Sequence, residues 1–161
     1  MIVISDTTIL STLYLIGKLD WIKKLFAEIY IPSAVYQELL ELESAGYDLS
    51  VFHEARWIKI KSIQNQSLVQ KLKEDLDIGE SEAIALAIES NADFLLIDER
   101  KGSRKAQELG IPTLGLLRLI LELKERGIIQ LVKPVLDNIK NKGGFWLSAA
   151  LYTKILEAAG E

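Results

Sequence analysis

The chain has 161 residues, of which 49% are hydrophobic and 26% charged, and 19 basic against 23 acidic side chains give a net charge of −4. This composition is typical of one globular domain, and the small acidic excess argues against broad, nonspecific coating of nucleic acid. The chain has no cysteine and a single histidine, His53. This excludes disulfides, zinc fingers, iron–sulfur clusters, thiol nucleophiles and multi-histidine metal sites, and leaves chemistry mainly to carboxylates, hydroxyls, lysine and arginine.

The N-terminal segment has neither the pattern of a signal peptide nor that of a membrane helix. Asp6 interrupts the first apolar run, and the uncharged stretch 7–17 is shorter than the roughly 20 residues that a membrane helix needs. We therefore expect a cytoplasmic protein that does not associate with membranes.

Short apolar runs alternate with helical patterns along the chain. We expect strands at 2–5, 28–31, 57–61, 94–97 and 111–114, of which the one at 57–61 is an edge strand that follows a polar connection. We expect helices at 7–16, 19–26, 34–43, 66–76, 79–90, 99–109 and 116–127, and Ser33 is expected to cap the helix at 34–43. The remainder is expected to be helical except at 141–144. Such alternation predicts an α/β layer fold with a parallel sheet, and a single domain over 1–161.

Two aspartates follow directly on strands of the buried type, Asp6 after 2–5 and Asp98 after 94–97. If both strands lie centrally in one parallel sheet, both carboxylates emerge at the carboxyl edge, where active sites of such folds lie. The alternative is that each aspartate caps the next helix, and the two roles are compatible.

Two glutamates are further candidates. Glu80 opens an apolar, buried helix, where Asp77-x-x-Glu80 also fits a capping box; Glu82 is two residues further on and is the alternative to Glu80. Glu38 borders the apolar stripe of the helix at 34–43, and taken alone it fits a solvated helix residue better than a site residue.

Together, Asp6, Glu38, Glu80 and Asp98 form a set of hard oxygen ligands of the kind that Mg²⁺ or Mn²⁺ prefers. Clustered carboxylates repel one another unless a cation lies among them. A divalent ion also activates water and neutralises charge during phosphodiester cleavage, so that no protein nucleophile is required.

The ordered series ISDTT (4–8), PSAVYQELL (32–40), LDIGESEAIALA (76–87) and FLLIDERKG (94–102) resembles the PIN-domain nuclease family, in particular its compact prokaryotic branch of type II toxin–antitoxin ribonucleases. The likeness covers about 1–131, and FWLSAALYTKIL (145–156) is also similar to that branch. Each motif is short, and the specificity comes from four motifs in the correct order.

The resemblance implies a three-layer α/β/α sandwich with a central, mainly parallel sheet of four or five strands, and a metal-dependent endoribonuclease acting on single-stranded RNA. It places the four acids on Asp6, Glu38, Glu80 and Asp98, with Asp6, Glu80 and Asp98 as metal ligands. It also places a hydroxyl neighbour on Thr7, which we expect to contact the substrate.

This chain departs from the family pattern after the fourth acid. Many members carry a further acid a few residues later, whereas here only Glu99 is adjacent and a basic segment follows. Arg100, Lys101 and Arg104 in that segment are expected to contact RNA phosphates; the alternative is a solvated helix face.

Helical segment 145–161 is expected to pack on its own domain, on a second copy in a homodimer, or on a cognate antitoxin. The alternative to a nuclease is a non-catalytic RNA-binding or protein-interaction module with the same fold. Phosphatases of the haloacid-dehalogenase type fit poorly because Thr8 stands where they carry a second aspartate, and P-loop or Rossmann proteins are excluded by the lack of a glycine-rich phosphate loop.

Overall fold

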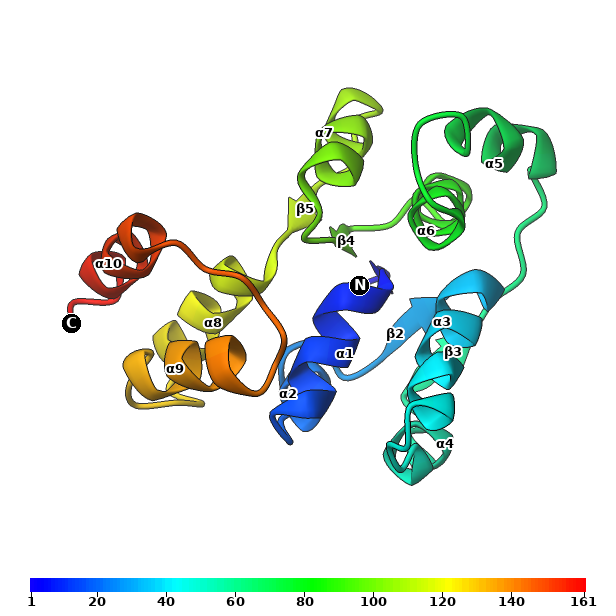
Figure 1. The fold of residues 1–161 in the computed structure, drawn as a ribbon. Coiled ribbons are helices and arrows are strands. Elements are labelled where there is room, and N and C mark those ends of the chain that lie inside the picture. Colours follow the sequence, from blue (N-terminus) through cyan, green and yellow to red (C-terminus); the bar gives the residue numbers. More distant parts are fainter.

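The computed structural model describes residues 1–161, and its centre is one five-stranded sheet (Figure 1). Every neighbouring pair of strands is parallel, in the order β3-β2-β1-β4-β5. The strands are β1 (Val3–Ser5), β2 (Ile29–Ile31), β3 (Ile58–Ile60), β4 (Phe94–Leu96) and β5 (Thr113–Leu114). The predicted parallel sheet is confirmed, as is the position of the strand around 57–61 at an edge.

Ten helices connect and cover the strands. They are α1 (Thr7–Leu15), α2 (Asp20–Phe26), α3 (Ser33–Ser44), α4 (Ser50–Glu54), α5 (Gln66–Leu72), α6 (Ile78–Glu89), α7 (Arg100–Glu108), α8 (Leu116–Glu125), α9 (Lys133–Asn141) and α10 (Ala149–Ala158). Up to residue 127 each expected element is present within two residues of its predicted bounds, except that the helix expected at 66–76 ends at Leu72.

The strands read as unbroken apolar runs because both faces of the sheet are covered. Val3 and Leu96 pack in a core with α1, α2, α3, α8 and α9, whereas Ile4 and Leu95 pack in a second core with α5, α6 and α7. Alternate residues of one strand thus enter different cores, as the two-residue repeat of a strand requires. The predicted three-layer α/β/α arrangement is confirmed.

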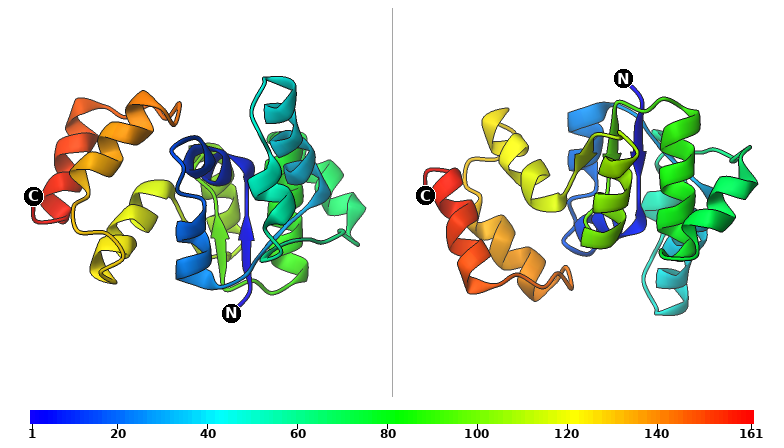
Figure 2. Two further views of the ribbon diagram at one scale, coloured as in Figure 1. Left: turned by 90° about the horizontal axis from the view of Figure 1, so that it is seen from below. Right: turned by 90° about the horizontal axis from the view of Figure 1, so that it is seen from above.

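The C-terminal helices α8, α9 and α10 gather at one end of the molecule, away from α5 and α6 (Figure 2). Tyr152 and Ile155 of α10 pack partly buried against the larger core, and α10 contacts α8. No helix in the structure combines the length and the apolar character needed to span a bilayer.

Three local predictions are wrong. The connection before β3 contains the helix α4, because Leu49 and Phe52 supply two buried apolar side chains there. The part of the chain after 127 is helical only in α9 and α10, so the helix expected at 128–132 and at 145–148 is absent; α10 begins at Ala149, where the Ser148 hydroxyl accepts the N–H of Leu151 at 3.1 Å.

The third concerns the start of α3, which Ser33 does not cap. Pro32 occupies the N-cap position in an extended conformation, and Ser33 is the first helical residue. The Glu82 carboxylate of α6 instead accepts the N–H of Ala34 at 2.7 Å. A partner from a distant part of the chain therefore replaces the local cap, which no local pattern indicates.

Truncation of a buried side chain in α6 is expected to destabilise the fold strongly. Ile84 is 0% exposed, whereas Ile88, one turn later in the same helix, is 40% exposed. We expect Ile84→Ala to lower the free energy of unfolding by about 2–5 kcal/mol and Ile88→Ala to lower it far less. Chemical denaturation of both variants measures the difference, and equal losses would contradict the layered core described here.

Candidate metal centre at the carboxyl edge of the sheet

The register of the central strands places Asp6 and Asp98 at the same edge of the sheet. Ser5 of β1 lies opposite Leu96 of β4, and the N–H of Asp6 donates to the Leu96 carbonyl at 2.8 Å. Both aspartates therefore follow the carboxyl ends of adjacent parallel strands, as the sequence predicts. This is the edge where α/β folds place their ligands.

Asp6 is a buried carboxylate with little compensation. It occupies the N-cap position of α1, yet its side chain makes no capping hydrogen bond, and it is 4% exposed. Burial raises the pKa of Asp6 to about 7, and repulsion from Glu80, Asp77 and Glu38 adds to the increase, against a lowering by the backbone N–H of Thr7. A helix-capping role therefore does not account for this side chain.

Glu80 combines structural and electrostatic features. Its N–H donates to Asp77 Oδ1 at 2.8 Å, and the Asp77 N–H donates back to Glu80 Oε2 at 3.4 Å, so the predicted capping box is present. Glu80 is also 6% exposed, and burial together with the charges of Asp77 and Glu99 raises its pKa to about 7. Capping and a place in the acidic cluster coexist in this residue.

Glu38 is held in place from two sides. The Thr7 hydroxyl donates to the Glu38 carboxylate, and the backbone N–H of Gly79 also lowers its pKa. Burial is nevertheless the largest influence and raises the pKa of Glu38, with Asp77 adding to the increase. A Cβ at Gly79 would displace the Glu38 carboxylate, so glycine permits the present position of this side chain beside α6.

The charge of Asp98 is not among those that raise the pKa of Asp6, Glu38 or Glu80. The N–H of Leu116 donates to Asp98 Oδ1 at 3.0 Å, so Asp98 caps α8 rather than the helix that follows it directly. Burial raises the pKa of Asp98, and the acidic residue that adds to this increase is Glu99. Glu38 and Glu80 thus add to the rise in the pKa of Asp6, whereas Asp98 is influenced by Glu99.

The two other acids considered from the sequence have structural partners. Glu82 contacts the start of α3, as described above. Glu99 accepts the N–H of Gly102 at 3.0 Å and caps α7. Between Glu80 and Glu82, Glu80 is the one that faces the other acids.

None of the ion pairs in the structure involves Asp6, Glu38, Glu80 or Asp98. No three acidic or histidine side chains converge closely enough to hold a metal ion as they stand. The donors are nonetheless all carboxylate oxygens, which suit a hard divalent cation, and a shared ion requires these side chains to turn toward one another.

The basic residues expected to bind RNA lie on α7, next to this cluster. Arg100, Lys101 and Arg104 are exposed, and none of them forms an ion pair. Gly102, between them, is buried: a Cβ there would lie 3.3 Å from Glu80 Cδ, so α7 packs directly on the acidic site. Thr7, expected to contact substrate, has its hydroxyl on Glu38.

Sequence reasoning assigned no site role to three residues that shape this cluster. The sequence pattern indicates only a helix cap at Asp77, yet its charge raises the pKa of Asp6, Glu38 and Glu80. Gly79 and Gly102 allow close approaches of Glu38 and Glu80. A glycine in the first turn of a helix has low helix propensity, and this was the available signal.

A family comparison identifies the fold. The model of the PIN domain family DUF3368 matches residues 2–161, which is nearly the whole chain. The chain belongs to the PIN domain family. Members of this family are typically nucleases and generally bind divalent metals, which agrees with the resemblance in the four sequence motifs.

Among solved structures, this PIN domain is similar to a PilT N-terminus domain protein from the hyperthermophilic archaeon Sulfolobus solfataricus P2. The two are 18% identical with a TM-score of 0.48, and the match covers 74% of this chain and 90% of that chain. No match was found among curated protein sequences.

The raised pKa values predict a dependence of stability on pH in the absence of metal. Asp6 and Glu80 bind protons up to a pH of about 7 when folded but only up to about 4 when unfolded, so their contribution is complete below about 4 and is lost as the pH rises through 7. With EDTA, we expect the melting temperature to fall between pH 5 and 8.

Asp6→Asn removes one of these charges and is expected to melt higher than the wild type at pH 8 in EDTA, with a smaller gain at pH 5. Glu43→Gln, an exposed change at the far end of α3, serves as control and should leave the pH profile unchanged. Identical profiles for Asp6→Asn and the wild type would show that Asp6 does not titrate as described.

Proposed function

We propose that this PIN domain is a metal-dependent endoribonuclease that cleaves phosphodiester bonds of single-stranded RNA. The observation that carries the proposal is Asp6, a buried carboxylate with no capping bond and no cation, clustered with Glu38 and Glu80 at the carboxyl edge of the sheet. A protein rarely keeps such an arrangement for stability alone, because each charge destabilises the others. Membership of the PIN family supports the same function.

Asp6, Glu80 and Asp98 are the residues that would hold Mg²⁺ or Mn²⁺. Such an ion supplies activation of water and neutralisation of charge on the scissile phosphate. Glu38 is the fourth acid, and its carboxylate, oriented by the Thr7 hydroxyl, is suited to accept a proton because its pKa is raised toward neutrality. Thr7 then contacts the substrate from beside this carboxylate.

Arg100, Lys101 and Arg104 provide the positive charge that this acidic protein needs to bind RNA. Their exposed side chains lie on α7, which packs on Glu80 through Gly102, so phosphates bound there lie close to the acidic site. Contacts to phosphates position a strand without reading its bases.

The biological setting that we propose is the toxin of a type II toxin–antitoxin pair in the cytoplasm. The support for it is the resemblance of the four motifs and of 145–156 to that branch. A cognate antitoxin and a second copy of the chain are the partners expected in this setting, and the C-terminal helices α8, α9 and α10 offer a surface for either.

The direct experiment is a cleavage assay on single-stranded RNA with Mg²⁺, Mn²⁺ or EDTA. We expect cleavage only with a divalent ion, and a loss of roughly 10²-fold or more in Asp6→Asn and in Asp98→Asn, the scale on which loss of transition-state charge stabilisation acts. Glu43→Gln should cleave like the wild type. Full activity in both aspartate variants would overturn the assignment of the site.

A specific observation favours the non-catalytic alternative: the Glu80 carboxylate accepts the N–H of Asp77 at the start of α6, and the Asp98 carboxylate accepts the N–H of Leu116 at the start of α8, roles that need no metal. This alternative predicts RNA binding without cleavage, and no rise in melting temperature with either ion. A metal-dependent rise that disappears in Asp6→Asn supports the nuclease, because an ion that binds only the folded state stabilises it.

A further inference from the structure

A hollow of about 260 Å³ lies between α5 and α7, beside the acidic site. We call it the α5–α7 cleft. Three cations line it, Lys101, Arg104 and Lys105, and Leu72 and Leu76 form its apolar floor. This volume is many times the space that one water molecule needs, so the cleft has room for a polar ligand.

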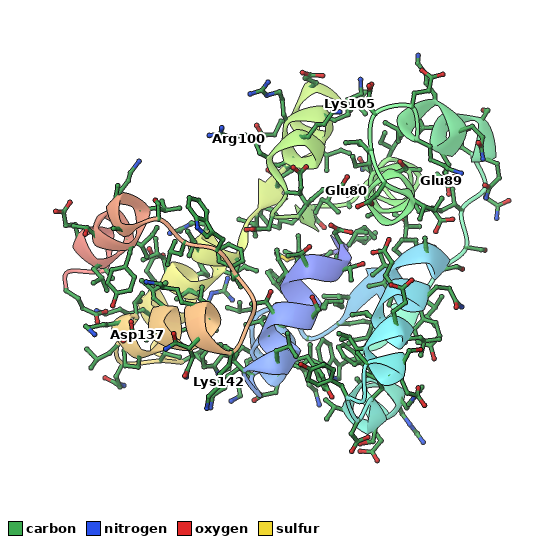
Figure 3. All side chains as sticks on the ribbon, in the orientation of Figure 1. Glu80, Glu89, Arg100, Lys105, Asp137 and Lys142 are labelled. Carbon is green, nitrogen blue, oxygen red and sulfur yellow. The ribbon has the colours of Figure 1, made fainter.

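The cations of the cleft come from one stripe of α7. Lys101, Arg104 and Lys105 stand at positions i, i+3 and i+4, which share a helix face. Lys101 and Arg104 form no ion pair, and Lys105 reaches Glu108 only at 4.0 Å. Figure 3 shows Lys105 on the side of α7 that faces α5, whereas Arg100 points to the other side. Two of the three cations of the cleft, Lys101 and Arg104, thus have no partner within the protein.

The cleft adjoins the acidic site through covalent and packing contacts. Leu76 on its floor directly precedes Asp77, the N-cap of α6. Lys101 on its wall directly precedes Gly102, which lies against Glu80. Leu76 and Lys101 thus connect the cleft directly to residues that contact the acidic site.

Two acids also line the cleft, and they restrict what fits it. Glu108 lies near Lys105, but the Asp75 carboxylate has no hydrogen-bond or ion-pair partner in the structure. Asp75 repels a phosphate, yet it is suited to accept a hydrogen bond from an amino group. Cytosine, adenine and guanine carry exocyclic amino groups, whereas uracil presents its N–H between two carbonyl oxygens that a carboxylate repels.

We propose that the α5–α7 cleft binds one nucleotide of single-stranded RNA next to the scissile phosphate. Lys101, Arg104 and Lys105 contact the phosphate, the leucine floor contacts the base, and Asp75 selects bases with an amino group over uracil. The proposal rests on the proposed function for the presence of RNA, and it adds a substrate subsite with a base preference.

The test is equilibrium binding of labelled oligocytidylate and oligouridylate of equal length in EDTA, where no cleavage intervenes. For the double variant Lys101→Gln, Arg104→Gln we expect about tenfold weaker binding and a salt slope reduced by about 1.4, since each phosphate contact to a single strand contributes about 0.7. The matched control is Lys142→Gln, Lys154→Gln, which removes two exposed, unpaired lysines elsewhere; Figure 3 shows Lys142 far from α7.

Asp75→Asn tests the base preference. The wild type should bind oligocytidylate about fivefold more tightly than oligouridylate, as one hydrogen bond to a charged group allows, and Asp75→Asn should reduce this ratio toward one. An unchanged ratio, or a salt slope in the α7 double variant equal to that of the control pair, overturns the proposal.

These outcomes separate the cleft from the nuclease. A wild type that cleaves RNA while Asp75→Asn keeps the wild-type ratio of oligocytidylate to oligouridylate binding refutes the cleft and leaves the proposed function intact. A wild type that binds RNA through the cleft but cleaves it with neither Mg²⁺ nor Mn²⁺ refutes the proposed function and leaves the cleft intact.

Discussion

The burial of neighbouring carboxylates is the constraint on which this structure depends at its functional edge. Asp6 and Glu80 are buried and Glu38 is half-buried, and the charges of these acids and of Asp77 add to the rise of their pKa values. No lysine or arginine pairs with the three candidate acids. Near neutral pH, Asp6 and Glu80 therefore either keep protons or share a bound cation. The stability of this edge of the sheet depends on which of the two is bound.

The parallel sheet is what creates this constraint. Adjacent strands β1 and β4 deliver Asp6 and Asp98 to one edge, and α3 and α6 carry Glu38 and Glu80 to it from positions far along the chain. Two glycines allow the final approach, Gly79 to Glu38 and Gly102 to Glu80. The same packing brings the basic face of α7 beside the acids, so negative and positive surfaces adjoin without neutralising each other.

Much of this arrangement is predictable from the sequence because its determinants are local or periodic. Strands buried on both faces read as apolar runs, and an aspartate that ends such a run marks the carboxyl edge, which places Asp6 and Asp98 correctly. The capping box at Asp77 and Glu80 is also a local pattern. The family likeness supplies the order in which the acids are brought together.

The remainder depends on contacts between distant residues. Glu82 replaces the cap that Ser33 was expected to supply for α3, and Asp98 caps α8 across 18 positions of the chain. The use of the Thr7 hydroxyl by Glu38, and the division of the α7 cations between a cleft and an open face, follow from how helices pack. Such details require the structure, because the rotation of a helix about its axis decides which of its side chains face a neighbouring element.

The central claim is that these acids bind a divalent cation, and crystals grown with Mn²⁺ test it most directly, through the anomalous scattering of the ion. The account predicts a peak in direct contact with carboxylate oxygens of Asp6 and Glu80, with side chains turned inward from their present positions. The claim is contradicted if, at saturating Mn²⁺, the residues of this edge are well ordered, no anomalous peak is present and the carboxylates have not moved.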